Sequence, residues 1–177
     1  LMFLPLMHRL RPWLAAAAAV SAMWQLPAHA LTAEQAIAIV DGDNNSRIAA
    51  LQDAVANGDA ARVAQYLNAM RDRQVQHGEG RAVIVRDGTA IDPVTGMAAV
   101  MPTATEDVRT NNRMRREIGN ALAELNLWVG TDSERLDAAR AMLKGATPDR
   151  LPMLEKALAQ EKNEAVRTEL ELARSAA

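Results

Sequence analysis

The chain has 177 residues, no cysteine, a formal net charge of −2 and only 3% aromatic residues. Without cysteine, thiol catalysis, thiolate metal sites and disulfide bonds are excluded. A weakly acidic chain gains little from the counterion release that drives nucleic-acid binding, so we expect no DNA or RNA partner. Abundant alanine with few aromatic residues is typical of closely packed helices, and it predicts a mainly α fold.

Residues 1–30 have the pattern of a secretory signal peptide. Basic side chains precede an apolar run over residues 13–24, and Ala28-His29-Ala30 supplies a small-x-small cleavage pattern. Met7 is an alternative start of the chain. A buried alanine-rich helix and an uncleaved membrane anchor stay open as other interpretations of the run. The pattern predicts export, so residues 31–177 should form a domain in the periplasm or on the periplasmic side of the inner membrane.

Three helices are expected between residues 31 and 71. The first covers residues 31–40 with Thr32 as its N-cap. The polar residues 41–46 then break the helical pattern. Asn57-Gly58-Asp59 ends the second helix and caps the third. Apolar residues recur at helical spacing along one face of this hairpin, and they are Ile48, Leu51, Ala54, Val55, Val63, Tyr66, Leu67 and Met70.

A β-ribbon insert is expected over residues 81–101. Residues 81–86 contain three strong strand formers in a row. Asp87-Gly88 is typical of a two-residue hairpin turn, because both residues tolerate a positive φ. This turn places Ile84 opposite Ile91 and Val85 opposite Ala90. Residues 93–96 should form a second turn, and residues 97–101 a weak third strand.

A long helix is expected to begin at Thr103, where residues 103–106 match a capping box. Its apolar stripe runs from Val108 to Val129 and includes Asn111, with Asn112 at the margin. A buried amide is costly unless it is paired, so we expect one of these side chains to bind the ribbon backbone and clamp it. Alternatively, a partner-docking patch is formed by Arg109, Asn111, Asn112, Arg113 and Arg116.

The C-terminal part should contain a second helical hairpin and a last helix. Gly145 ends one helix, Thr147-Pro148 begins its partner, and Asn163 caps the last helix. Arginine next to an apolar residue recurs just inside three helix starts, at Arg47, Arg135 and Arg167. This repetition is similar to HEAT-type repeats, in which stacked helical pairs bury a shared core. An ordinary helical bundle is the alternative.

Other candidate sites carry weaker patterns. Residues 41–45 resemble the start of a calcium loop, but Ser46 and Gln52 stand where an EF-hand requires glycine and glutamate. A helix-capping turn is therefore favoured. His77 is the one histidine of residues 31–177, and no serine, cysteine or metal-ligand motif accompanies it. We expect no catalytic, cofactor-binding or metal-binding residues.

Several short motifs lie in an order that matches a known family. They are residues 47–51 (RIAAL), 85–88 (VRDG), 92–96 (DPVTG), 108–116 (VRTNNRMRR) and 154–158 (LEKAL), with Val166-Arg167 near the C-terminus. In these motifs the chain resembles the N-terminal exported extension of the permease subunit of urea-type ABC transporters. That subunit belongs to the branched-chain amino acid permease group. The resemblance covers most of residues 31–177.

The resemblance implies a role in urea transport and a protein that is not an enzyme. In the family, membrane-spanning helices follow this extension and carry the substrate, so no urea-contacting residue is expected in residues 31–177. We expect the chain to be a fragment of such a permease, the product of a split gene or the product of a truncated open reading frame. It would act as a scaffold or docking domain for other transporter subunits, with the periplasmic substrate-binding protein as a candidate partner and the membrane reached through the permease part.

Two alternatives are a free-standing periplasmic HEAT-like adaptor and an exported hydrolase. The hydrolase is disfavoured because no convergent catalytic motif is present in the sequence.

Overall fold

The computed structural model describes residues 30–177, and in this part the protein is mainly helical with one small antiparallel sheet. The prediction of a mainly α fold with a β insert is confirmed. The predicted signal peptide and its alternatives lie outside the described residues. Between residues 30 and 177, no helix has both the length and the apolar character needed to cross a bilayer.

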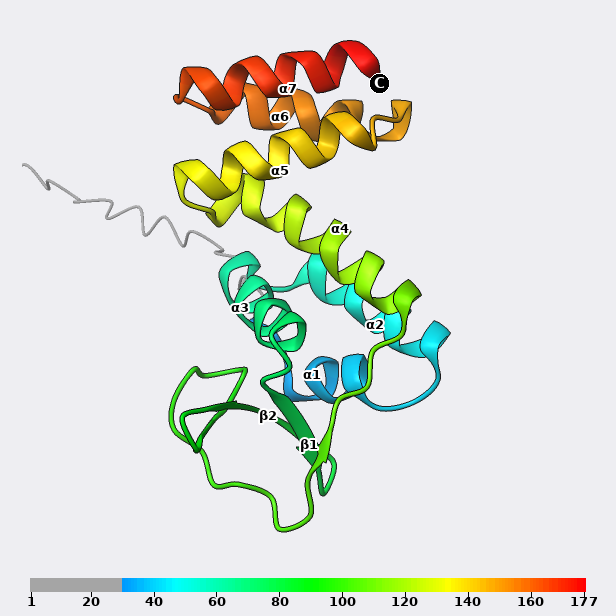
Figure 1. Ribbon diagram of the computed structural model, residues 1–177, viewed down its shortest axis with the longest axis vertical. Helices are drawn as coiled ribbons and strands as arrows, with labels where there is room; N and C mark the ends of the chain where they lie inside the picture. The colour runs from blue at the N-terminus through cyan, green and yellow to red at the C-terminus, as the bar shows by residue number, and fades with distance from the viewer. Residues whose placement is uncertain (1–29) are drawn as a thin grey trace, which may run out of the picture.

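Figure 1 shows an elongated molecule with α1 to α3 and the sheet at one end, α5 to α7 at the other, and α4 running between them. The helices are α1 (Ala33–Val40), α2 (Asn44–Asn57), α3 (Ala60–Arg71), α4 (Asn112–Val129), α5 (Asp132–Lys144), α6 (Leu151–Gln160) and α7 (Glu164–Ala176), with a short 3-10 turn, η1 (Pro148–Arg150), before α6. The strands are β1 (Val75–Gly78), β2 (Arg81–Arg86), β3 (Thr89–Ile91) and β4 (Glu106–Asp107).

The first core, which we call the lower core, joins α1, α2, α3, the sheet and most of α4. Each of its short helices begins at a side chain that accepts a hydrogen bond from the free N–H groups of the first turn. These N-caps are Thr32, Asp43 and Asp59, and the predicted caps at Thr32 and Asp59 are confirmed. The hydroxyl of the fully buried Tyr66 donates to the carbonyl of Ala36 at 2.7 Å, which ties α3 to α1.

The sheet has the strand order β3-β2-β1-β4, and all of its pairs are antiparallel. The predicted pairing of Ile84 with Ile91 and of Val85 with Ala90 is confirmed. The turn between these strands has φ values of 49° at Asp87 and 77° at Gly88, as the hairpin pattern requires. Residues 97–101 do not form a strand, because they contribute a single bridge from Ala98 to Ile91.

The predicted start of the long helix at Thr103 is wrong. Glu106 and Asp107 form β4 and pair with His77 and Gln76 of β1. The sequence pattern predicted neither β1 nor β4. The chain before β4 crosses β1 closely, and a Cβ placed on Gly78 would lie 1.8 Å from the carbonyl oxygen of Ala104. Because residues 106–107 pair as a strand and the chain passes close to β1, the capping pattern at residues 103–106 does not start a helix. The long helix α4 begins at Asn112.

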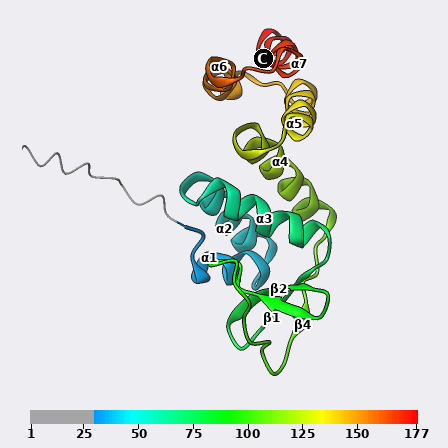
Figure 2. The ribbon, with the colours of Figure 1, turned by 90° about the vertical axis from the view of Figure 1, so that its left-hand side faces the viewer.

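The second core, the upper core, lies among α5, α6, α7 and the end of α4. Figure 2 shows α6 and α7 side by side, with α5 between them and α4. The central helix serves both cores, since Leu122 and Leu125 are buried in the lower one and Leu127 in the upper one. Val129, which the predicted stripe placed in the core, is 43% exposed because the helix ends there.

A repeated contact joins successive helices. Arg47, Arg135 and Arg167 each lie four residues after the N-cap of their helix, at Asp43, Thr131 and Asn163. Each guanidinium donates to a backbone carbonyl at the end of the helix before it. The acceptors are Ile39, Gly130 and both Leu158 and Glu161, at distances between 2.9 and 3.1 Å. These carbonyls have no partner inside their own helix, so the arginines satisfy them.

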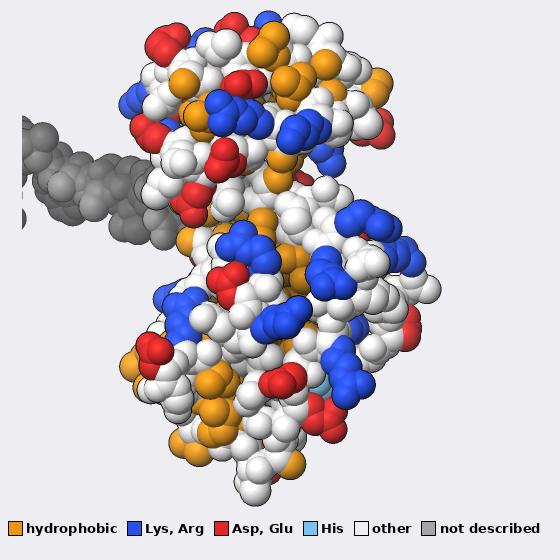
Figure 3. Space-filling view, viewed as in Figure 1, with side chains coloured by type: hydrophobic (Ala, Val, Ile, Leu, Met, Phe, Trp, Pro, Cys, Tyr) orange, Lys and Arg blue, Asp and Glu red, His pale blue; other side chains and the backbone are white. Residues whose placement is uncertain are grey.

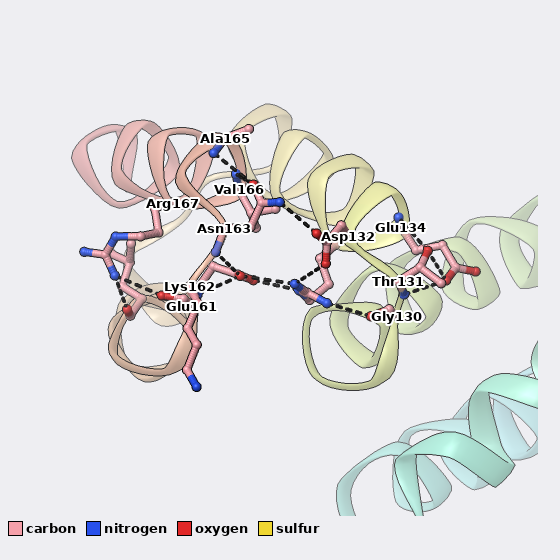
Figure 4. A network of polar contacts seen from close by, with 12 residues as sticks. Gly130, Thr131, Asp132, Glu134, Glu161, Lys162, Asn163, Ala165, Val166 and Arg167 are labelled. Carbon is pink, nitrogen blue, oxygen red and sulfur yellow. Dashed lines mark hydrogen bonds and ion pairs between the residues drawn. The ribbon is translucent and has the colours of Figure 1, made fainter.

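In the upper core this contact belongs to a larger network (Figure 4). The carboxylate of Glu161 accepts hydrogen bonds from Arg135 Nε at 2.7 Å and Nη2 at 3.2 Å. It also accepts from the backbone N–H of Lys162 and of Asn163. The amide of Asn163 donates to Asp132, which joins the starts of α5 and α7.

We expect Arg47→Met to lower the free energy of unfolding by about 1–3 kcal/mol, because two charge-assisted hydrogen bonds are lost. Arg47 is 7% exposed, and besides Ile39 it donates to the carbonyl of Arg109 at 2.9 Å. Urea titration measures the change. The control is Arg81→Met, which removes an exposed ion pair and should stay within about 0.5 kcal/mol of the wild type. Equal effects of the two variants would contradict the proposed role of Arg47.

The stability contributed by Glu161 should depend on pH. Hydrogen bonds from Arg135 hold the pKa of Glu161 below its ordinary value. Such a carboxylate stabilises the fold above its unfolded pKa, about 4.3 for glutamate, and this contribution is lost as the pH falls through the lower folded value. Urea titrations of wild type and Glu161→Gln should therefore differ at neutral pH and converge below about pH 4. A difference that stays constant across this range would refute the expectation.

Candidate docking surface

Six exposed arginines surround the end of α3 and the start of α4, and we call them the arginine surface. In Figure 3, Lys and Arg side chains gather over the middle of the molecule on the face shown. The members of the arginine surface are Arg71, Arg73, Arg109, Arg113, Arg115 and Arg116.

The members of the arginine surface form few ion pairs. Among the described residues, the one ion pair that involves its members joins Arg71 to Asp72 at 3.4 Å. Arg113 donates instead to the amide oxygen of Asn45, and Arg115 to that of Asn112. Three arginines of the upper helices differ, because Arg135, Arg140 and Arg167 each face a carboxylate within ion-pair distance. Positive charge is therefore left available at the start of α4.

The two asparagines of the predicted clamp have other roles. Asn111 is the N-cap of α4, and its side chain accepts from the backbone N–H of Met114 at 2.8 Å. Asn112 is exposed and accepts from Arg115 at 2.8 Å. The prediction that either side chain clamps the ribbon is wrong, because the ribbon is paired through backbone to β1 and packs on α1.

The five predicted docking residues lie together around the first turn of α4, and all are exposed. Arg109 precedes the helix, and its carbonyl is the acceptor for Arg47. Arg113 extends toward the start of α2, where it meets Asn45. Docking through these residues stays a prediction, and the structure adds neighbours from α3 that the sequence did not indicate.

A hollow of about 170 Å³ lies beside these residues, between the end of α3 and α4. Three members of the arginine surface line it, although the sequence separates Arg71 and Arg73 from Arg115 by some forty positions. Sequence reasoning missed the hollow, since it depends on how α3 packs against α4. Its lining residues are Met70, Arg71, Arg73, Thr110, Arg115, Ile118 and Gly119.

The other candidate sites have structural roles in the described residues. Asp43 caps α2 through the backbone N–H groups of Asn45 and Ser46, so the favoured helix-capping turn is confirmed. His77 lies in β1, where it pairs with Ala82 and Glu106. Between residues 30 and 177, no group of three or more histidine or acidic side chains is arranged to hold a metal ion.

Comparisons of the chain with protein-family models, with curated proteins and with solved structures found no match.

We expect Asn111→Ala to lower the free energy of unfolding by about 1 kcal/mol, the usual cost of losing an N-cap. Asn112→Ala is the matched control, because its exposed amide contacts one surface arginine, and it should stay within about 0.5 kcal/mol of the wild type. Thermal and urea unfolding of both variants measure the difference. If both asparagines proved equally important, the capping role of Asn111 would be refuted.

Proposed function

We propose that this chain is the exported, non-catalytic docking part of the permease subunit of a urea-type ABC transporter. The observation that carries the proposal is the segment over residues 108–116. This segment is the strongest element of the sequence resemblance, and it supplies four of the six arginines of the arginine surface. One continuous stretch thus combines the family resemblance with exposed, largely unpaired positive charge.

The proposed role is protein contact at the periplasmic side of the inner membrane. Exposed arginines that mostly lack ion-pair partners favour association with an acidic partner surface, because they raise the rate of encounter and fix the register of the complex. The periplasmic substrate-binding protein of the transporter is the partner we propose. Urea itself would pass through membrane-spanning helices of the permease.

The second candidate is a free-standing periplasmic adaptor built from HEAT-like repeats. The arginines at positions 47, 135 and 167 favour it, because each contacts the end of the preceding helix in the same way. We propose HEAT-like stacking for the helices in both candidates. The two candidates differ in one respect: in the permease, membrane-spanning segments are part of the same protein as the helical domain, and in the adaptor they are not.

The genomic reading frame beyond the codon for Ala177 distinguishes the two candidates. A continuation rich in membrane spans, next to genes for transporter ATPases, supports the permease proposal. A stop codon without transporter genes nearby supports the adaptor.

We expect residues 31–177 to bind the substrate-binding protein encoded beside them, with an affinity that falls as salt is added. The double variant Arg113→Glu, Arg116→Glu should weaken binding at least about tenfold, which corresponds to about 1.4 kcal/mol. Arg174→Glu, at an exposed position on α7, is the control and should bind like the wild type. Biolayer interferometry with the immobilised domain measures both. No binding by the wild-type domain would contradict the proposed partner.

A further inference from the structure

Two residues that line the hollow between α3 and α4 lower the stability of the backbone at their positions. Arg73 follows the end of α3 in the left-handed region, with φ of 59°. The N–H of Arg73 donates to the carbonyl of Met70, and that of Gln74 to the carbonyl of Ala69, so residue 73 occupies the helix-ending position that glycine usually takes. An arginine there carries a backbone strain that glycine would avoid.

Gly119 is the second such residue. It lies in the interior of α4, where glycine lowers helix stability relative to alanine. No packing constraint explains it, because a Cβ placed on Gly119 would meet no atom within 4 Å. The position is exposed and lines the hollow. The sequence therefore has an arginine where glycine suits the fold and a glycine where alanine suits the fold, both facing the same space.

Residues that oppose local stability without a structural reason are typical of functional surfaces. In this hollow, the two residues affect how a ligand could bind. Arg73 and Arg115 line the hollow and form no ion pair with a described residue, while the missing side chain at Gly119 lets another chain approach the backbone of α4. A second hollow of about 360 Å³ shares Arg71 and Gly119 with the first, so the accessible groove continues along α3 and α4.

The opposite end of this groove is acidic. Glu134 and Asp137 of α5 line the second hollow together with Arg71, whereas the first hollow has no acidic lining residue. An acidic ligand is therefore attracted at the start of α4 and repelled near α5. This asymmetry favours a ligand whose carboxylates are confined to one end.

We infer that the groove between α3 and α4 binds an acidic segment of a partner protein, with carboxylate side chains on Arg73 and Arg115 and the segment's backbone over Gly119. Planar guanidinium groups match carboxylates through paired hydrogen bonds. The volume of about 170 Å³ at the arginine end suits individual side chains. This inference rests on the proposed docking function and names the chemistry of the partner.

The test uses a fluorescent peptide in which aspartate alternates with glycine, and a matched peptide in which asparagine replaces aspartate. The aspartate peptide should bind the domain, and the asparagine peptide should not. Arg73→Gly and Arg115→Ala should each weaken binding at least about tenfold, and Gly119→Leu should weaken it to the same degree. The control Arg174→Ala, on α7, should leave the affinity unchanged.

Thermal unfolding separates this role from a structural one. Arg73→Gly and Gly119→Ala should each raise the melting temperature by a few degrees, since each replaces an unfavourable backbone choice. A substitution that stabilises the fold and weakens binding identifies its residue as part of the docking groove. Lowered melting temperatures for both variants would overturn the inference.

Three other outcomes overturn it. The loss on Arg174→Ala could match that on Arg73→Gly, which would show unspecific charge attraction. Gly119→Leu could leave binding unchanged, which would exclude close approach at this position. Vesicles of phosphatidylglycerol could displace the peptide from the wild type but not from the arginine variants, which would make a lipid surface the ligand.

The outcome is independent of the proposed partner. Binding of the substrate-binding protein that is unaffected by Arg73→Gly, Arg115→Ala and Gly119→Leu would refute this groove and leave the docking function intact. Binding of the aspartate peptide in the groove, without any binding of the substrate-binding protein, would refute the transporter partner alone.

Discussion

The structure depends on the way in which the carbonyl end of one helix is joined to the beginning of the next. The last carbonyls of an α-helix lack partners inside that helix and carry partial negative charge. Arg47, Arg135 and Arg167 supply both a donor and a positive charge at these ends. Because each arginine lies at the same distance from its N-cap, the cap fixes the beginning of a helix and also aims the arginine at the helix before it.

This arrangement suits a protein with few aromatic side chains. Alanine occupies many of the buried positions in both cores, so each helix pair contributes little apolar area to the interior. Polar contacts at the helix ends then fix the angle and register of neighbours that small side chains leave poorly defined. The network around Glu161 shows the most developed form, since one carboxylate joins the side chain of Arg135 to the backbone before α7.

Features encoded within a few residues were predictable from the sequence. The caps at Thr32, Asp59 and Asn163 and the hairpin register around Asp87-Gly88 depend on local chemistry, and they agree with the structure. The start of α4 was not predictable in this way. Its location depends on β4 pairing with a strand some thirty residues earlier, which a capping pattern at Thr103 cannot reveal. The same holds for the candidate site. The arginines at the start of α4 are close in sequence and were predictable, whereas Arg71 and Arg73 lie near them only because α3 packs against α4.

The central helix has a consequence for how the protein unfolds. α4 has 18 residues, a length of about 27 Å, and its two ends are buried in different cores. If the lower core opened, most of α4 would lose its tertiary support, and a helix of this length is barely stable alone in water. Loss of one core should therefore weaken the other. The molecule is expected to behave as one cooperative unit, although its interior is divided in two.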